Sequence, residues 1–75
     1  MEDATVKKRS LTIAGHRTSV SLEAAFWDAL KRIAAAEGRS LATLAAEVDR
    51  ERGKANLSSA LRVFVVRRLT EERGG

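Results

Sequence analysis

The sequence predicts a small, mostly α-helical domain that opens with a short β-ribbon or hairpin and continues with three helices. Polar and apolar residues alternate over residues 9–22, which is the period of a β-strand. Beyond Glu23 the apolar residues recur at helical spacing. The chain has 75 residues and no proline, and this length predicts one small domain.

The alternating segment contains two runs, residues 9–13 and 17–22, separated by Ala14, Gly15 and His16. Gly15 can adopt the positive φ that a tight hairpin turn requires. The segment is therefore either a hairpin or a single strand over residues 17–22 that follows a loose arm. In that strand, alternation predicts one face with Arg17, Ser19 and Ser21 and an opposite face with Thr18, Val20 and Leu22.

The ends of the three helices are indicated by capping residues. Gly38 and Gly53 suit the left-handed position that follows a helix, so the first helix should end near residue 37 and the second near residue 52. Ser40 is a natural N-cap for the second helix, and Asn56 can cap the third.

Each helix has an apolar face. The first presents Leu22, Phe26, Ala29, Leu30, Ile33 and Ala34, and the second presents Leu41, Leu44, Ala45 and Val48. In the third, the residues expected to face inward are Leu57, Leu61, Phe64, Val65 and Leu69. Val63 and Val66 make this last stripe wider than a monomer of this size can cover. We divide the chain into a flexible basic arm over residues 1–8, a core over residues 9–53 and a C-terminal helix over residues 54–75 that packs on the core.

The composition excludes several functional classes. The chain has no cysteine and one histidine, His16, so disulfides and the common zinc sites are excluded, and we expect no metal or cofactor. No nucleophile lies beside an evident base and no glycine-rich phosphate loop is present, so we expect no enzyme. No apolar run is long enough for a signal peptide or a membrane span. We therefore expect a cytoplasmic protein without membrane contact.

The charge distribution favours a polyanionic partner. The net charge is +4. Residues 1–17 carry four basic and two acidic side chains, residues 18–53 carry five and six, and residues 54–75 carry five and two. A basic beginning and a basic last helix thus flank a nearly neutral middle, a pattern compatible with nucleic-acid binding. Trp27 lies off the main apolar stripe of its helix, where a tryptophan usually covers a partner subunit or a neighbouring helix.

Residues 17–52 resemble a ribbon-helix-helix domain. The strand "RTSVSL" leads directly into the helix "EAAFWDALKRIAAAEG", and "GRS" then precedes the second amphipathic helix "LATLAAEVDRERG". The segment "NLSSALRVFVVRRL" is similar to the added C-terminal helix of a branch of short bacterial ribbon-helix-helix proteins.

The resemblance implies an intertwined homodimer in which each chain contributes one strand to a two-stranded ribbon. The ribbon's outer face would enter the major groove of double-stranded DNA. The implied base contacts are Arg17, Ser19 and Ser21. The implied phosphate contacts are Lys7, Lys8, Arg9, Ser40 and Leu41, and the dimer core would contain Val20, Leu22, Phe26, Trp27 and Leu30.

This interpretation predicts a transcriptional regulator that binds DNA as a dimer. The alternative is a dimer that does not read DNA and acts as a protein-interaction module, either antitoxin-like or an adaptor. The choice between these two functions depends on whether residues 9–13 form a strand. If these residues pair with residues 17–22 as a hairpin, a strand-sharing dimer would have four strands, too wide for a groove of roughly 12 Å. Ser10 and Thr12 would then flank the ribbon.

Overall fold

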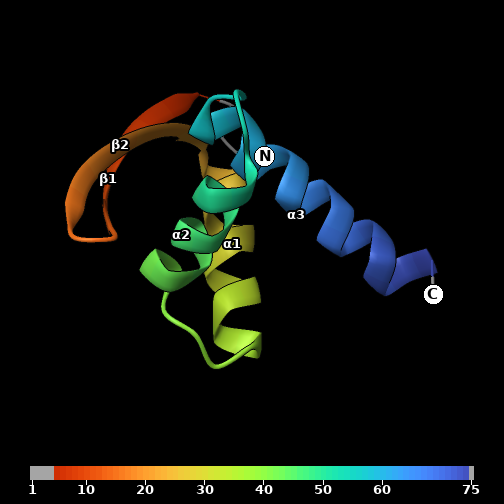
Figure 1. Cartoon of the computed structure of the whole chain (residues 1–75). Coiled ribbons are helices and arrows are strands. Elements are labelled where there is room, and N and C mark those ends of the chain that lie inside the picture. The colour runs from red at the N-terminus through yellow and green to blue at the C-terminus, as the bar shows by residue number, and fades with distance from the viewer. Residues whose placement is uncertain (1–4, 75) are drawn as a thin grey trace.

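The computed structural model describes residues 5–74, in which two strands precede three helices. The strands are β1 (Val6–Ile13) and β2 (His16–Glu23), and the helices are α1 (Ala24–Ala36), α2 (Leu41–Glu51) and α3 (Leu57–Gly74). The expected order of two strands and three helices is confirmed. Figure 1 shows the hairpin curving along one side of α1 and α2, with α3 extending away on the other side.

The two strands form a hairpin within one chain, which resolves the choice between a hairpin and a loose arm. They pair antiparallel from Val6 opposite Glu23 to Ile13 opposite His16. The turn has only two residues, Ala14 (φ 52°) and Gly15 (φ 83°). Two successive positive φ angles define a type I′ turn, whose twist matches that of the flanking strands.

Strand β1 is longer than expected. It begins at Val6 rather than at residue 9, so Lys7 and Lys8 lie in the strand and not in a flexible arm. The reason is that β2 extends to Glu23, and its length offers backbone pairing as far as Val6. The remainder of the expected arm, residues 1–4, lies outside the described residues.

The predicted caps are in place. At the end of α1, Arg39 N–H donates to Ala34 C=O (2.9 Å) and Gly38 N–H donates to Ala35 C=O (3.1 Å), and Gly38 has a φ of 67°. These bonds form a Schellman motif. The Ser40 hydroxyl accepts from Thr43 N–H at 3.0 Å and begins α2.

Asn56 and Gly53 complete the helix boundaries. The Asn56 side-chain oxygen accepts a hydrogen bond from Ser59 N–H at 2.8 Å and caps α3. Gly53, with a φ of 61°, follows the end of α2.

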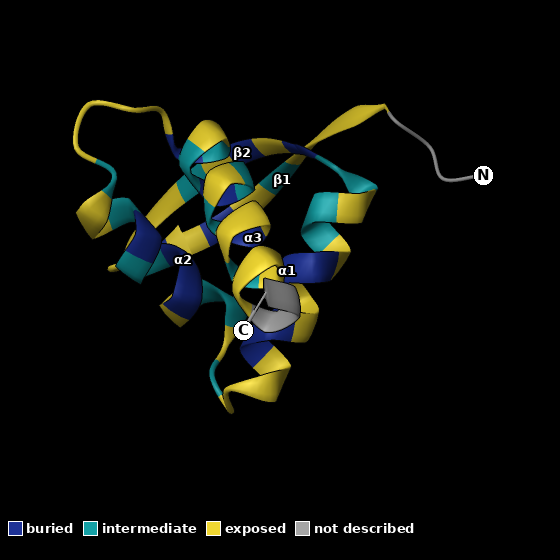
Figure 2. Ribbon diagram, turned by 90° about the vertical axis from the view of Figure 1, so that its right-hand side faces the viewer, coloured by how far each residue is buried: buried dark blue, intermediate teal, exposed yellow. Residues whose placement is uncertain are grey.

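A single hydrophobic core joins all five elements, and Figure 2 marks the buried residues in dark blue along the ribbon. Its largest fully buried side chains are Val20, Leu22, Leu30, Leu44, Leu61 and Val65. Phe26 and Trp27 are partly buried and pack against this core. Leu69, which was expected to face inward, is 44% exposed. Val63 and Val66 are also exposed, so one side of α3 is an uncovered apolar stripe, and Figure 1 shows the C-terminal part of α3 extending away from the other elements.

Candidate nucleic-acid interface

The outer face of the hairpin is a continuous polar surface. Residues paired across an antiparallel sheet point to the same side, and three outward pairs join Lys8 to Ser21, Ser10 to Ser19 and Thr12 to Arg17. All six side chains are exposed. We call this surface the ribbon face, composed of Lys8, Ser10, Thr12, Arg17, Ser19 and Ser21. It places two basic residues at diagonally opposite corners of a two-stranded ribbon.

The ribbon face brings together the three residues predicted to contact bases, Arg17, Ser19 and Ser21. Ser10 and Thr12 are missing from those predicted contacts, although they lie beside Ser19 and Arg17 in the register. The signal that locates them is the alternation of residues 9–13 combined with a two-residue turn, which together determine the register.

Arg9 lies on the inner face of the hairpin. Arg9 lies opposite Val20, and its guanidinium carbon stands 5.0 Å from the centre of the Trp27 ring. Its Nε is buried and has no hydrogen-bond partner within residues 5–74. Arg9, expected to contact phosphate, is thus engaged on the core side, where its contact with Trp27 joins β1 to α1. Trp27 also packs against the hydrophobic core, which accounts for its partial burial.

The outer edge of β2 is bonded to α3. In a two-residue hairpin the pair that flanks the turn exchanges backbone hydrogen bonds, and bonded and non-bonded pairs then alternate. Ser21 belongs to a non-bonded pair, so its N–H and C=O point away from β1. The Ser58 hydroxyl accepts from Ser21 N–H at 3.0 Å, and Arg62 Nη2 donates to Ser21 C=O at 3.1 Å.

Arg62 also holds the end of β2 through an acidic side chain. Its Nε donates to Glu23 Oε1 at 3.0 Å, and its guanidinium carbon lies 5.9 Å from the centre of the Phe26 ring. The carboxylate of Glu23 is stabilised first by a hydrogen bond from its own backbone N–H and then by the bond from Arg62. Together these hold the pKa of Glu23 below its ordinary value.

The N-terminus of α2 contains the other two expected phosphate contacts, Ser40 and Leu41. Ser40 is exposed and Leu41 is half-buried. The Ser40 hydroxyl accepts from Thr43 N–H and donates to the Thr43 hydroxyl at 2.8 Å. The first amides of a helix carry a partial positive charge, so this end is compatible with an anion.

Ion pairs beside this helix end leave little net charge around it. Arg39 donates to Glu37 at 3.0 Å and to Glu47 at 2.5 Å. Glu37 also pairs with Arg68 of α3, which lies over the Phe64 ring. These pairs connect the α1–α2 loop, α2 and α3, and their two positive and two negative charges balance.

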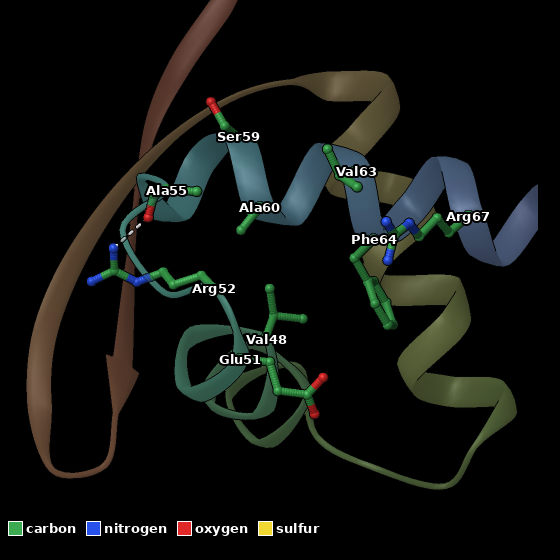
Figure 3. Close-up of a pocket in the computed structure, with 9 residues that line it drawn as sticks. All are labelled: Val48, Glu51, Arg52, Ala55, Ser59, Ala60, Val63, Phe64 and Arg67. Carbon is green, nitrogen blue, oxygen red and sulfur yellow. Dashed lines mark hydrogen bonds between the residues drawn. The ribbon is translucent and has the colours of Figure 1, made fainter.

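A groove of about 340 Å³ lies on the side of α2 and α3 shown in Figure 3. Val48, Ala60 and Phe64 line it, with charged side chains at its rim. Of these, Arg52 is already bonded to Asp49 and to the Ala55 carbonyl, both at 2.6 Å. The other residues that line the groove are Glu51, Ala55, Ser59, Val63 and Arg67.

The described residues contain neither a metal-binding cluster nor a membrane-spanning helix. Among residues 5–74, no three His, Cys, Asp or Glu side chains are gathered so as to hold a metal ion. No helix in that range is long and apolar enough to cross a membrane.

Comparison with known proteins agrees with the fold. The family described as a ribbon-helix-helix domain matches residues 6–69. The chain belongs to the ribbon-helix-helix domain family. The match includes β1 and most of α3, so both lie inside the family's domain. Ribbon-helix-helix domains typically bind DNA as dimers and are generally not enzymes.

A solved structure shows the same arrangement. An uncharacterized protein from Bordetella pertussis Tohama I is 39% identical in sequence and superposes with a TM-score of 0.76. The match covers 95% of this chain and 62% of that protein, so the present ribbon-helix-helix chain spans less than two thirds of its length. No curated protein matches this sequence.

Proposed function

We propose that this chain is the DNA-binding domain of a transcriptional regulator and that it reads DNA with the ribbon face. One observation carries the proposal: the hairpin register collects six exposed polar side chains, two of them basic, on a two-stranded antiparallel ribbon. The major groove admits an element of this width, and arginine, serine and threonine are side chains that bond to base edges. Family membership and the net charge of +4 support the same conclusion.

The hairpin supplies two strands from one chain. The resemblance implies that each chain of an intertwined dimer supplies one strand, whereas here β1 and β2 of one chain form the two-stranded sheet. The side chains expected in the dimer core already pack within one chain, with Val20, Leu22 and Leu30 buried and Phe26 and Trp27 against them.

The proposal is tested with fluorescently labelled DNA duplexes. Binding to a random-sequence duplex over a salt series measures the phosphate contribution, because the logarithm of the affinity falls linearly with the logarithm of salt concentration. A duplex selected from a random pool then reports base recognition. We expect Arg17→Ala to weaken binding to the selected duplex about tenfold or more, with a much smaller loss on random DNA.

Arg32→Ala is the matched control, since it removes one exposed positive charge from α1, outside the ribbon face. It should leave discrimination between the two duplexes unchanged. Equal losses for Arg17→Ala and Arg32→Ala would show that the hairpin does not read bases.

The alternative function, a protein-interaction module, is favoured by the surface of α3. Val63, Val66 and Leu69 are 51%, 53% and 44% exposed, and Val63 also lines the groove of Figure 3. An exposed apolar stripe beside a groove is typical of a docking surface for a protein. Failure of the wild-type chain to bind random DNA even at low salt would transfer the function to this surface, and Val66→Asp would then abolish partner binding.

A further inference from the structure

We propose that the outward side of α3 binds an amphipathic helix of another protein, and that this helix carries acidic residues beside its apolar stripe. The surface is a row of four exposed residues at helical spacing along α3, which we call the outer seam: Ser59, Val63, Val66 and Thr70. The inference names the partner of the docking surface on α3 and does not depend on DNA reading by the ribbon face.

Helix α3 is apolar on two sides, although the core of this chain covers only one of them. The inward side contributes Leu57, Leu61 and Val65, which are buried. On the outward side, Val63 and Val66 are 51% and 53% exposed. Valine is a poor helix former, because its branched side chain loses rotamer freedom in a helix. The two exposed valines therefore add little to α3 itself, and burial by a partner would turn them into a stabilising contact.

The spacing of the outer seam is that of a helix–helix contact. Its members are separated by four, three and four positions, the alternation that keeps the apolar positions of a heptad repeat on one face of a helix. The two valines occupy the centre of the seam, so a helix that lies along it packs against both at once. Figure 1 shows the C-terminal part of α3 extending away from the other elements, which leaves this part of the helix accessible.

The groove of Figure 3 borders the outer seam on one side. Val63 belongs to both, and Ala60 and Phe64 continue the apolar surface from it toward α2. Side chains of a docked helix can therefore enter the groove while its apolar stripe covers the seam. This is the arrangement by which an amphipathic helix is recognised in a hydrophobic groove.

The charges beside the outer seam favour an acidic partner. The positions that flank a heptad seam hold two basic residues and no acidic one: Ala60, Arg62, Arg67 and Leu69. Arg62 is bonded to Glu23, whereas Arg67 is exposed and forms no ion pair with any side chain that the structure describes. An acidic residue at the facing position of a partner helix would pair with Arg67, and a basic one would be repelled. Glu51, exposed on the α2 rim of the groove, keeps an acidic helix along α3.

A second copy of this chain is a poorer occupant of the same surface. In a parallel pair of α3 helices, Arg62 of one copy meets Arg67 of the other across the heptad contact, and the like charges repel. In an antiparallel pair, the flanking positions of the two copies face each other, and none of them is acidic. Arg67 stays unpaired in both arrangements. The outer seam lies on α3, so it is separate from the strands through which the family resemblance implies dimerisation.

Two fluorescently labelled peptides test the proposal on the full chain without DNA. Both are designed helices of about three heptads with leucine along the apolar stripe. One carries glutamate at the flanking positions and the other carries lysine, so each peptide repels itself. We expect fluorescence anisotropy to show that the glutamate peptide binds about tenfold more tightly than the lysine peptide, or more.

Arg67→Glu should remove or reverse that preference. The matched control is Arg32→Glu, which makes the same change of charge at an exposed residue of α1 and should preserve the preference. Equal affinity of the wild-type chain for the two peptides, or a preference that Arg67→Glu leaves unchanged, would overturn the proposal.

Val66→Asp tests the seam itself. It should abolish binding of the glutamate peptide and leave the far-UV circular dichroism as in wild type, since Val66 is 53% exposed. Sedimentation of the same variant without peptide identifies the competing occupant. If Val66→Asp lowers the oligomeric state of the chain, a second copy covers the seam and the proposal is wrong. No DNA is present in these measurements, so their outcome is independent of base reading by the ribbon face.

Discussion

Replacing Leu61 by alanine tests whether α3 is part of the folding unit of this domain. Leu61 is 0% exposed and belongs to the core that all five elements share. The change removes three buried carbon atoms, at roughly 0.8 kcal/mol each, and leaves a cavity that adds to the loss. We expect the free energy of unfolding to fall by about 3 kcal/mol. A 75-residue domain has only about 4–11 kcal/mol in total.

Urea unfolding followed by far-UV circular dichroism and by the fluorescence of Trp27, the single tryptophan, measures this loss. Leu69→Ala is the control: it makes the same change on the same helix at a residue that is 44% exposed, and it should cost less than about 0.5 kcal/mol. For each protein, the unfolding transitions followed by circular dichroism and by Trp27 fluorescence should coincide, because α3 unfolds together with the rest of the domain. A loss below about 1 kcal/mol for Leu61→Ala would refute the packing of α3 on the core.

Three smaller predictions concern single contacts, each measured by urea unfolding. Ser40→Ala should cost about 1 kcal/mol, because it removes the N-cap of α2. Ala14→Asn should stabilise the hairpin by a few tenths of a kcal/mol, since asparagine tolerates the positive φ that Ala14 adopts. The pKa of Glu23 is lowered from its ordinary value of 4.5, so the ionised carboxylate stabilises the folded chain at pH values above 4.5. This stabilisation is lost as the pH falls from 4.5 through the lowered pKa. Glu23→Gln should therefore lose less stability than wild type between neutral and acidic pH.

Helix boundaries and the hairpin turn could be predicted because they depend on neighbouring residues. The caps at Ser40 and Asn56 and the glycines at Gly38 and Gly53 act within one turn of chain. The division of β2 into a polar and an apolar face follows from strand geometry alone. These local rules are sufficient to predict the order of the elements and the polar residues that β2 contributes to the ribbon face.

The contacts that define the edge of the ribbon could not be predicted in the same way. Ser58 and Arg62 lie 37 and 41 residues from Ser21, and nothing in either segment alone signals the other. Their side chains suit an exposed helix face as well as a strand edge. Arg9 is similar, because a basic residue near the start of the chain suggests phosphate contact until its partner Trp27 is known.

The hairpin sets a condition on DNA binding by the ribbon face. A hairpin in a strand-sharing dimer would give a sheet of four strands, which a groove of roughly 12 Å excludes. A loss of discrimination between the two duplexes in Arg17→Ala would therefore show that the ribbon face still reaches the base edges. A chain that ignores DNA even at low salt would instead assign the function to the exposed apolar stripe of Val63, Val66 and Leu69 on α3.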